Sequence, residues 1–408
     1  MLKVYYIITL LLNYLAPIIL KYRILKKKED TDRYVEKLGK YKINLPNKII
    51  WFHASSLGEL KSVENFIKSV MSDLSDNNYK ALITTSTKSS GDYAKKISSE
   101  QIIHQYAPID TPQIVKKFLG HWKPKIGIFI ESEIWPNLIM ECQKNDIALL
   151  LLNARFSPNS LRKWNLIKSI FLSIMKNFKI ITTMSQSIRE SLVIMGLKNS
   201  EFIGNLKFYD PNNKIDNKKD KDNFVAMSIH PGELKFIISA HQKISQMNKN
   251  FTSIIIPRHI NKILKFEQFL ENINCKYTKY SQNNKLTPGI ILVDKYNIAE
   301  KFFNLSKIVF MGGSFIKHGG QNPLEPARKN CKVLHGPSIY NFNEIYDFLQ
   351  KNKISSLVKN EEDLIRHINL NLNNPMEEKF NNIIDAHGVE IFNNTLDKVS
   401  RFIKNEIK

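Results

Sequence analysis

Short apolar segments alternate with amphipathic segments through the first half of the chain. The apolar segments are rich in Ile, Val, Leu and Thr and lie at Lys48–Ser55, Lys80–Ser86, Lys125–Ser132, Ile147–Arg155 and Lys179–Ser185. Between them, apolar residues recur with the spacing of an amphipathic helix. Buried strands that alternate with helices predict a parallel sheet with helices on both faces.

A second series of the same kind follows, with expected strands at Phe224–His230, Phe251–His259, Gly289–Lys295, Lys307–Ser314 and Lys332–Gly336. Between the two series lies a charged, Asn-rich stretch with almost no apolar residue, as is typical of a linker. A chain of 408 residues is long enough for two such domains. We therefore predict α/β domains at 25–210 and 224–408, joined by a linker at 211–223, with the last helix packing back on the first domain.

The amino terminus is apolar and uncharged from Val4 to Leu20, and a basic cluster from Lys21 to Lys28 follows it. This length is close to the minimum for crossing a hydrocarbon layer of ~30 Å. No small-residue cleavage site follows, so a membrane-anchor helix over 1–24 is favoured over a signal peptide. The basic cluster predicts that the rest of the chain stays on the cytoplasmic side of the inner membrane. Two alternatives remain: a buried first helix, or, because of Asn13 and Pro17, a helix lying in the interface.

The charge balance predicts an anionic partner. Lys and Arg number 60 against 38 Asp and Glu, a formal charge of +22, which fits phospholipid headgroups, a phosphorylated substrate or nucleic acid. Part of this excess reflects a chain rich in Lys, Asn and Ile throughout. No aromatic-basic readout motif is present, so we expect no nucleic-acid partner. The cysteines are far apart and show no zinc or disulfide spacing, and the sequence leaves the oligomeric state open.

A first candidate site is WFHASSLGEL, Trp51–Leu60, where an expected strand meets an expected helix. Ser56 and Glu59 have the spacing of a capping box, which explains both residues without any catalysis. A carboxylate at such a turn can also take a proton from an attacking hydroxyl. Both interpretations of Glu59 stay open on this segment alone.

A second candidate is IESEIWPNL, which again ends an apolar segment. Glu131 and Glu133 are two positions apart, so in extended chain their side chains point to opposite sides. We expect only one of them at a site, where Glu131 would orient a neighbouring base or stabilise a developing charge. Trp135 and Pro136 are expected to rigidify the turn.

Two cationic side chains are candidate phosphate ligands. Lys207 lies in GNLKF, just before the linker, and Arg258 ends the apolar segment IIIPRH after Pro257. The planar fork of an arginine suits phosphate oxygens. Lysine and arginine are also common on solvated surfaces. The only local reasons to assign a function are the position of Lys207 between the domains and that of Arg258 at a strand end.

The strongest local signal is MGGSFIKHGGQNPLEPA, Met311–Ala327, with two glycine pairs before an expected helix. Asn322, Pro323 and Glu325 have the pattern of an N-cap, a first helical residue and a third-position carboxylate. The amides of such a helix start favour a phosphate, and Glu325 would accept hydrogen bonds from a ribose diol. A simply capped helix is the alternative. The glycine spacing fits neither a dinucleotide fingerprint nor a P-loop.

Taken in order, HASSLGE, ESEIWPN, NARFS, GNLKF, PRH and GGSF followed by GGQNPLEPA resemble the Kdo transferases of lipopolysaccharide assembly. These enzymes move 3-deoxy-D-manno-octulosonic acid (Kdo) from CMP-Kdo to the lipid A precursor, lipid IVA. The resemblance extends over nearly the whole chain. It implies a GT-B fold, in which two Rossmann-like domains face a cleft, with the acceptor in the first domain and the donor in the second. It also implies an inverting transfer that needs no metal or cofactor.

The resemblance assigns roles to individual residues. Glu59 would be the general base, while Glu131 and Lys207 would support the transition state. The CMP site would be lined by Pro257, Arg258, Gly313, Ser314, Asn322, Pro323, Leu324 and Glu325, with a further stretch at Tyr296, Asn297 and Ile298. The family's usual Gly-Glu pair is absent from this last stretch, where Asn297 and Ile298 stand instead. A bisphosphorylated lipid acceptor and an anionic membrane surface would both suit the basic chain.

Two other functions fit parts of the sequence. A different membrane-associated GT-B enzyme would use a UDP-sugar to make another glycolipid. A basic binding protein without catalysis would leave the apolar amino terminus unexplained.

Overall fold

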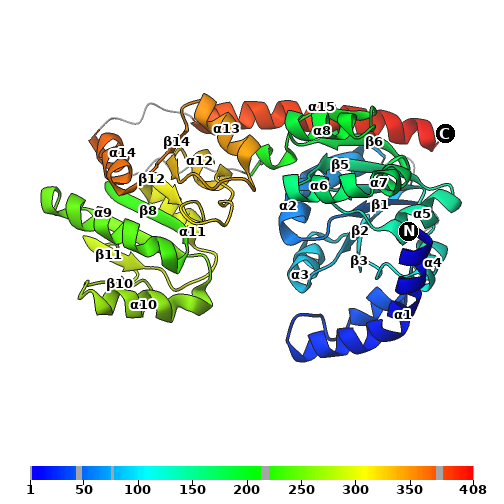
Figure 1. The fold of residues 1–408 in the computed structure, drawn as a ribbon, viewed down its shortest axis with the longest axis horizontal. Helices are drawn as coiled ribbons and strands as arrows, with labels where there is room; N and C mark the ends of the chain where they lie inside the picture. The colour runs from blue at the N-terminus through cyan, green and yellow to red at the C-terminus, as the bar shows by residue number, and fades with distance from the viewer. Residues whose placement is uncertain (1, 43–47, 75–77, 213–219, 374–379, 408) are drawn as a thin grey trace. The chain divides into compact units, whose positions relative to one another are not determined.

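The computed structural model describes the chain except for residues 1, 43–47, 75–77, 213–219, 374–379 and 408 and the side chains of 220 and 221. The described residues form two compact units (Figure 1). The first unit comprises Met1–Tyr209 and Gly388–Lys408, and the second comprises Asp210–His387. Helix α15 (Phe380–Glu406) begins in the second unit, and most of its length belongs to the first.

The first unit is built on a seven-stranded parallel sheet, counted over the described residues, with the order β3-β2-β1-β4-β5-β6-β7. Its strands are β1 (Ile49–His53), β2 (Lys80–Thr85), β3 (Ile102–Tyr106), β4 (Ile126–Ile130), β5 (Ala148–Ala154), β6 (Phe178–Thr183) and β7 (Ser200–Phe202). The five predicted strands are confirmed. The edge strands β3 and β7 were missed, because one carries His104 and Gln105 and the other is only three residues long.

Five helices of this unit begin at hydroxyl caps in the turns that follow strands. The helices of the unit include η1 (Tyr34–Leu38), α2 (Leu57–Asp73), α3 (Lys88–Ile97), α4 (Pro112–Trp122), α5 (Pro136–Lys144), α6 (Pro158–Leu166), α7 (Lys168–Met175), α8 (Gln186–Ile194) and η3 (Leu206–Phe208). A side-chain oxygen accepts a backbone N–H at Ser56, Thr87, Thr111, Ser157 and Ser185. These caps satisfy amides that would otherwise lack a partner.

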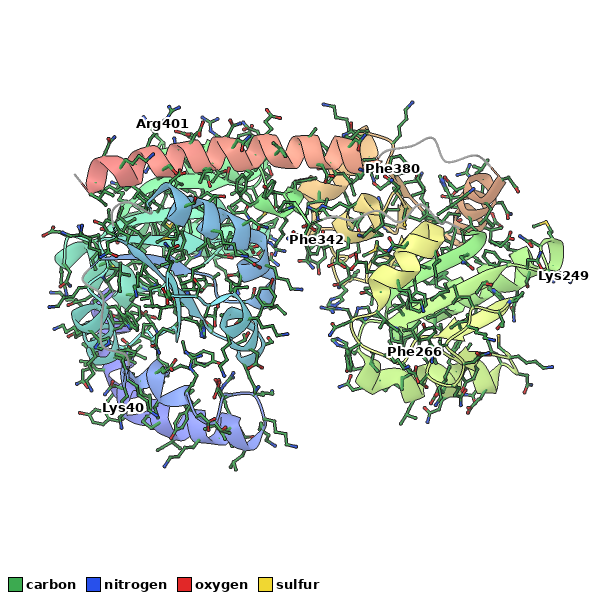
Figure 2. All side chains as sticks on the ribbon, turned by 180° about the vertical axis from the view of Figure 1, so that it is seen from behind. Lys40, Lys249, Phe266, Phe342, Phe380 and Arg401 are labelled. Atoms are coloured by element: carbon green, nitrogen blue, oxygen red, sulfur yellow. The ribbon has the colours of Figure 1, made fainter. Side chains whose placement is uncertain are left out.

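Aromatic side chains fill the space between the first sheet and its helices. Trp51 is fully buried, and its ring packs 5.1 Å from that of Phe118 and 4.9 Å from that of Phe129 between centroids. Phe392 of α15 lies 6.2 Å from Phe66 and belongs to the same unit. Figure 2 shows the side chains packed around the strands of each unit. Burial of this apolar surface is the main driving force for folding each unit.

The second unit repeats the architecture, and over the described residues its seven parallel strands have the order β10-β11-β9-β8-β12-β13-β14. They are β8 (Asp220–Ile229), β9 (Thr252–Pro257), β10 (Thr278–Lys279), β11 (Gly289–Leu292), β12 (Ser306–Met311), β13 (Lys332–His335) and β14 (Ser355–Leu357). Strand β8 starts four residues before its predicted start, because 220–223 pair in the sheet. The linker predicted at 211–223 is therefore too long at its end, and 213–219 lie outside the described residues.

The helices of the second unit are η4 (Pro231–Glu233), α9 (Leu234–Met247), η5 (Ile260–Lys262), α10 (Ile263–Asn272), α11 (Ala299–Leu305), α12 (Leu324–Arg328), α13 (Asn343–Lys351) and α14 (Glu361–Asn373). Phe266 of α10, which is labelled in Figure 2, and Phe310 of β12 belong to its buried core. The short edge strands β10 and β14 were not predicted, since two or three residues leave no periodic pattern. The predicted class, two doubly wound α/β units, is confirmed.

Each sheet reverses its strand order at one place. In the first unit the reversal lies between β1 and β4, and in the second it lies between β8 and β12. Ligands of doubly wound folds bind outside the carboxyl ends of the strands at this point. The turns after these four strands are therefore the first places to look for chemistry.

Helix α1 (Leu2–Leu25) is attached to the first unit through a polar stripe. Tyr5 Oη donates to Asp110 at 2.8 Å, and Thr9 Oγ1 accepts from the Asn137 amide at 2.9 Å. Asn13 donates to Gln113 at 2.6 Å and accepts from the Thr111 hydroxyl at 3.1 Å. Tyr5, Thr9 and Asn13 are four residues apart, so they share one face.

The rest of the α1 surface is apolar and exposed. Ile8, Leu11, Leu15 and Ile18 are between 53% and 65% exposed. The helix is long and apolar enough to cross a membrane, and only 11% of its most apolar window is buried. The alternative of a buried first helix is therefore wrong.

Candidate active site

Glu59 stands in the turn after β1, at the third position of α2. The Ser56 hydroxyl accepts the Glu59 N–H at 3.3 Å and donates to Glu59 Oε1 at 2.7 Å, while Ser55 N–H donates to Oε2 at 2.8 Å. This arrangement confirms the predicted capping interaction. The same bonds hold the half-buried carboxylate in one orientation at the point where the sheet reverses its strand order.

The surroundings of Glu59 favour its neutral form. Burial raises the pKa of Glu59, and the negative charges of Glu131 and then Glu133 raise it further against the two hydrogen bonds from Ser56 and Ser55. A carboxyl group with a raised pKa is a stronger base when it is ionised. The capping interaction therefore coexists with an environment suited to proton transfer.

Glu131 follows β4 and is almost completely buried, at 5% exposed. Its Oε1 lies 2.5 Å from Lys207 Nζ, and its Oε2 lies 3.7 Å from an Arg155 guanidinium nitrogen. Its backbone has φ +62°, a left-handed conformation that a residue with a side chain rarely adopts. Such strain is common at functional sites, and the structure thus brings together two residues that the sequence linked only by resemblance.

Lys207 is positioned by two asparagines. Asn205 Oδ1 accepts the Lys207 N–H at 3.0 Å, and Asn153 Oδ1, at the end of β5, accepts the Leu206 N–H at 3.1 Å. Asn153 also has a left-handed backbone, with φ +57°. The short helix η3 that carries Lys207 is therefore attached directly to the strand beside β4.

The alternation of an extended chain predicted that Glu133 points away from the site, but the structure shows that it does not. The left-handed conformation of Glu131 ends the extended chain, so both carboxylates lie close enough to affect Glu59. Burial alone would raise the pKa of Glu133, but hydrogen bonds from His53, at 3.1 Å, and from Trp135, at 2.7 Å, hold that pKa below its ordinary value. Trp135 thus has a structural role, as expected.

His53 connects Glu133 to the core of the sheet. The Thr84 hydroxyl accepts a hydrogen bond from Trp51 Nε1 at 2.7 Å and lies 2.8 Å from His53 Nδ1. If Thr84 donates to Nδ1, the ring proton is on Nε2, which faces Glu133. This set of bonds satisfies every polar atom of the His53 ring and fixes the position of Glu133.

In the second unit, Glu233 holds the turn that follows β12. Its fully buried carboxylate accepts the backbone N–H groups of Gly313 at 2.8 Å, of Ser314 and Phe315 at 3.0 Å each, and of His230 at 3.1 Å. Four amide donors stabilise a buried carboxylate charge. Glu233 thereby joins the turns after β8 and β12.

These bonds change the interpretation of Gly313 and Ser314, which the sequence assigned to ligand binding. Both N–H groups are used by Glu233, and the buried Ser314 hydroxyl donates to Met311 O at 2.5 Å and accepts from Gly336 N–H at 2.8 Å. Ser314 therefore shapes the turn and has no side-chain donor left for a ligand.

Arg258 and the segment Tyr296–Ile298 lie at the carboxyl edge of the same sheet. Arg258 directly follows β9, its N–H donates to Ile229 O at 3.0 Å, and its exposed guanidinium has no partner among the described residues. Tyr296 is 67% exposed in the turn after β11, which pairs with β9, and Asn297 has φ +59°. Ile298 is the N-cap of α11.

Helix α12 begins later than predicted and is only five residues long. Its N-cap is Pro323, so Asn322 lies one residue before the cap, and Glu325 is the second helical residue, not the third. Asn322 Oδ1 accepts the Leu324 N–H at 3.1 Å, and Pro326 has no N–H to offer. The predicted anion site at this helix start is therefore weak, although the exposed Glu325 side chain stays available.

Several residues of these sites were missed or undervalued in the sequence. His53 is the last residue of β1, Arg155 and His230 directly follow β5 and β8, and Glu233 ends the short helix η4 after β8. The rule that ligands bind at the carboxyl ends of strands would have found them. The spacing of His230 and Glu233 also matches a capping pair, as at Ser56 and Glu59.

The comparisons with known proteins agree with this architecture. A family model described as 3-deoxy-D-manno-octulosonic-acid transferase (kdotransferase) matches residues 32–210. The 3-deoxy-D-manno-octulosonic acid transferase of Rickettsia bellii is 31% identical over 93% of each chain, and that of Haemophilus influenzae is 28% identical over 74% of each. A glycosyltransferase structure from Rickettsia africae covers 89% of this chain and 100% of its own, with a TM-score of 0.58 at 15% identity.

A UDP-N-acetylglucosamine 2-epimerase structure from Listeria monocytogenes also has a TM-score of 0.58, at 14% identity, covering 88% of this chain and 98% of its own. At such low identity these two structures show the shared fold alone. These relatives make the chain a glycosyltransferase, and its fold has two Rossmann-like units. The chain belongs to the 3-deoxy-D-manno-octulosonic acid transferase family, and it acts in lipopolysaccharide biosynthesis.

Proposed function

We propose that this protein transfers Kdo from CMP-Kdo to the lipid A precursor, lipid IVA, with inversion at the anomeric carbon. The observation that carries the proposal is the oriented Glu59 carboxylate, whose pKa is raised, at the switch point of the first unit. In this proposal the first unit, within 25–210, binds the acceptor. The second, within 224–408, binds the donor.

In the transfer, Glu59 takes the proton of the attacking acceptor hydroxyl. The hydroxyl oxygen forms a bond to the anomeric carbon, and the bond from that carbon to the CMP phosphate oxygen breaks, leaving the electron pair on CMP. Burial and the neighbouring Glu131 and Glu133 make Glu59 a stronger base than a solvated glutamate.

Glu131 and Lys207 would act on charge in the transition state. As the leaving group departs, positive charge grows on the sugar and negative charge grows on the phosphate. The bonded pair of Glu131 and Lys207, 2.5 Å apart, is already oriented, so it needs no rearrangement when these charges appear. Arg155 balances the remaining carboxylate oxygen of Glu131.

On the donor side, Arg258 is the proposed phosphate ligand because its exposed guanidinium lies at the carboxyl edge beside the switch point. Pro257, Tyr296, Asn297 and Ile298 would line the CMP site at the same edge. Asn322, Pro323, Leu324 and Glu325 would complete it, with Glu325 accepting from the ribose. Gly313 and Ser314 would shape this site without donating to the ligand.

Fixed cations would supply the charge that a metal supplies in other transferases. Lys207 and Arg258 are the proposed groups, and a guanidinium or ammonium can stabilise a phosphate without a bound ion. Full activity in the presence of a chelator is the expected result. Loss of activity that Mg²⁺ restores would contradict this part of the proposal.

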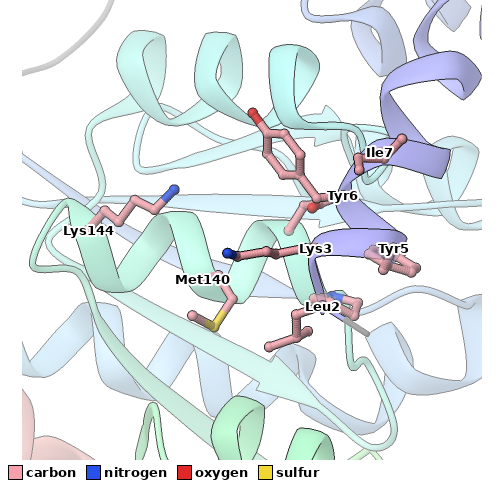
Figure 3. A pocket seen from close by; sticks show the side chains of 9 residues that line it. Leu2, Lys3, Tyr5, Tyr6, Ile7, Met140 and Lys144 are labelled. Atoms are coloured by element: carbon pink, nitrogen blue, oxygen red, sulfur yellow. The ribbon is translucent and has the colours of Figure 1, made fainter.

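The protein would work at the cytoplasmic face of the inner membrane, with α1 in the plane of the interface. Tyr5, Thr9 and Asn13 use one face of α1 to bind the first unit, while the exposed apolar face meets lipid. A pocket between the first turns of α1 and helix α5 is lined by apolar residues such as Leu2 and Met140 and by Lys3 and Lys144 (Figure 3). These lysines would meet anionic headgroups.

The test of the proposed function is a transfer assay with CMP-Kdo and the lipid A precursor. Release of CMP together with a product that carries added Kdo is expected. Transfer from a UDP-sugar but not from CMP-Kdo would overturn the proposal.

A further inference from the structure

Three histidines gather around the switch point of the second unit. His230 directly follows β8, His259 follows Arg258 after β9, and His318 lies in the turn after β12. The ring of His318 packs edge-on against that of His230 at 4.4 Å between centroids, and the ring of His259 lies 6.2 Å from His230. None of these three residues has a role in the function proposed above.

His230 carries an unsatisfied polar atom. Its Nε2 is buried and has no hydrogen-bond partner among the described residues. Buried polar atoms are normally hydrogen-bonded, and exceptions call for a specific explanation. The ring that packs against His230 belongs to His318, which is exposed, so it can move without disturbing the core.

Gly313 lies against this atom. A Cβ at Gly313 would lie 3.3 Å from His318 Cδ2, 3.5 Å from Gln321 Nε2 and 3.6 Å from His230 Nε2, so a side chain there would press on these residues. Gly313 thus leaves these three side chains uncovered by a side chain of its own. It lies between the ends of β8 and β12, where doubly wound folds bind their ligands.

The charge around His230 is positive. Burial, then His318, His259, Arg258 and Lys262 lower the pKa of His230 to about 4, so the ring is neutral at pH 7. The nearest carboxylate, Glu233, already accepts four backbone N–H groups and is fully buried. A neutral imidazole can donate its N–H to an anion. Because it carries no charge, it does not repel a cationic side chain that binds the same anion.

We propose that His230 and His318, with His259 beside them, bind an anionic group of the sugar donor at the switch point of the second unit. This inference rests on the proposed function, because the donor CMP-Kdo supplies the anion. Two of its groups have the required chemistry, the phosphate of CMP and the carboxylate of the sugar acid. Both are compact oxyanions that accept imidazole N–H donors.

The test is steady-state transfer kinetics on purified full-length variants. His230→Asn should raise the KM for CMP-Kdo about 10-fold or more, the effect of losing a hydrogen bond to a charged group. His230→Gln should restore part of the loss, since its amide nitrogen reaches close to the position of Nε2. Removal of the exposed His318 ring in His318→Ala should raise KM several-fold.

Inhibition by CMP separates the two anions. If the histidines bind the phosphate, the Ki of CMP rises with KM in His230→Asn. If they bind the sugar carboxylate, the Ki of CMP stays within 2-fold of the wild-type value while KM rises. Either result supports the inference and assigns the source of the anion.

The control is His241→Asn. His241 is also buried in the second unit, where its Nδ1 lies 2.9 Å from Ser253 Oγ, and it packs on Phe251 at the amino end of β9. Unchanged KM in both His230→Asn and His318→Ala, or an equal rise in His241→Asn, would overturn the inference. If His230→Asn does not fold, the exposed His318→Ala variant decides. Absence of wild-type transfer from CMP-Kdo would instead count against the proposed function.

Discussion

Lys207 Nζ lies 2.5 Å from Glu131 Oε1, although the two residues are 76 positions apart in the chain. The contact joins the end of β4 to the short helix η3, and it gives an almost fully buried carboxylate a cationic partner. Removal of one partner from such a pair leaves the other charge buried and unpaired, which lowers the stability of the fold.

Lys207→Met should therefore affect both stability and rate. Loss of the ammonium leaves Glu131 with Arg155 at 3.7 Å, so unfolding in urea should show a loss on the order of 3 kcal/mol. The rate constant kcat should fall by about 100-fold or more. In a cycle with Glu131→Gln, the double variant should lose less stability than the sum of the single variants. Additive losses would show that the pair is not coupled.

Replacement of the base should abolish transfer and leave donor binding intact. Glu59→Gln should lower kcat by roughly 100- to 10,000-fold, the range for general acid–base catalysis, while calorimetry shows unchanged CMP affinity. Glu64→Gln is the matched control, because Glu64 lies on the same helix and pairs with nearby Lys68 and Tyr93, outside the candidate site. Turnover near the wild-type rate in Glu59→Gln would remove Glu59 as the base.

The same variant should stabilise the fold at neutral pH. The pKa of Glu59 is raised in the folded protein above its ordinary value of 4.5, so ionisation of Glu59 costs stability as pH rises through the raised pKa. Glu59→Gln removes this cost. Its thermal midpoint should exceed that of the wild type at pH 7.5, and the difference should vanish below about pH 4.5. A difference that is independent of pH would contradict the assigned electrostatics.

Arg258→Ala should weaken CMP binding by about 10-fold or more, because an arginine–phosphate contact is charge-assisted. Titration calorimetry with CMP measures this directly. The control is Arg366→Ala, which removes an exposed arginine paired with Asp363 in α14. Equal affinity for CMP in the two variants would refute the role of Arg258.

A charge on the apolar face of α1 should release the protein from membranes. Leu11→Asp buries a carboxylate in the interface and should lower binding to anionic phospholipid vesicles by about 10-fold or more. Leu264→Asp is the control, since Leu264 is 66% exposed against 65% for Leu11 but lies in the second unit. Co-sedimentation measures both, and an equal effect in the two variants would contradict the role of α1.

The sequence predicted the central strands of both sheets because strands buried on two faces are apolar along their whole length. Their order, and hence the switch points, does not follow from that pattern. Neither does the left-handed turn at Glu131, which overturned the expected separation of Glu131 and Glu133. The resemblance placed Gly313 and Ser314 in the CMP site, and their bonds to Glu233 could not be predicted because Glu233 lies far away in the sequence.

Helix α1 was also predicted only in part. Hydropathy identified α1 but left open whether it spans the bilayer or lies on it. Tyr5, Thr9 and Asn13 looked like isolated polar residues in an apolar helix. Only the fold shows that they meet Asp110, Asn137 and Gln113 on the first unit.

The most direct test is incubation of the purified protein with CMP-Kdo and the lipid A precursor, with the lipid products weighed by mass spectrometry. We expect the lipid to gain the mass of one or more Kdo residues, with CMP released, and no gain with Glu59→Gln. An unchanged lipid mass with CMP-Kdo, alongside a product from a UDP-sugar, would contradict Kdo transfer to this acceptor.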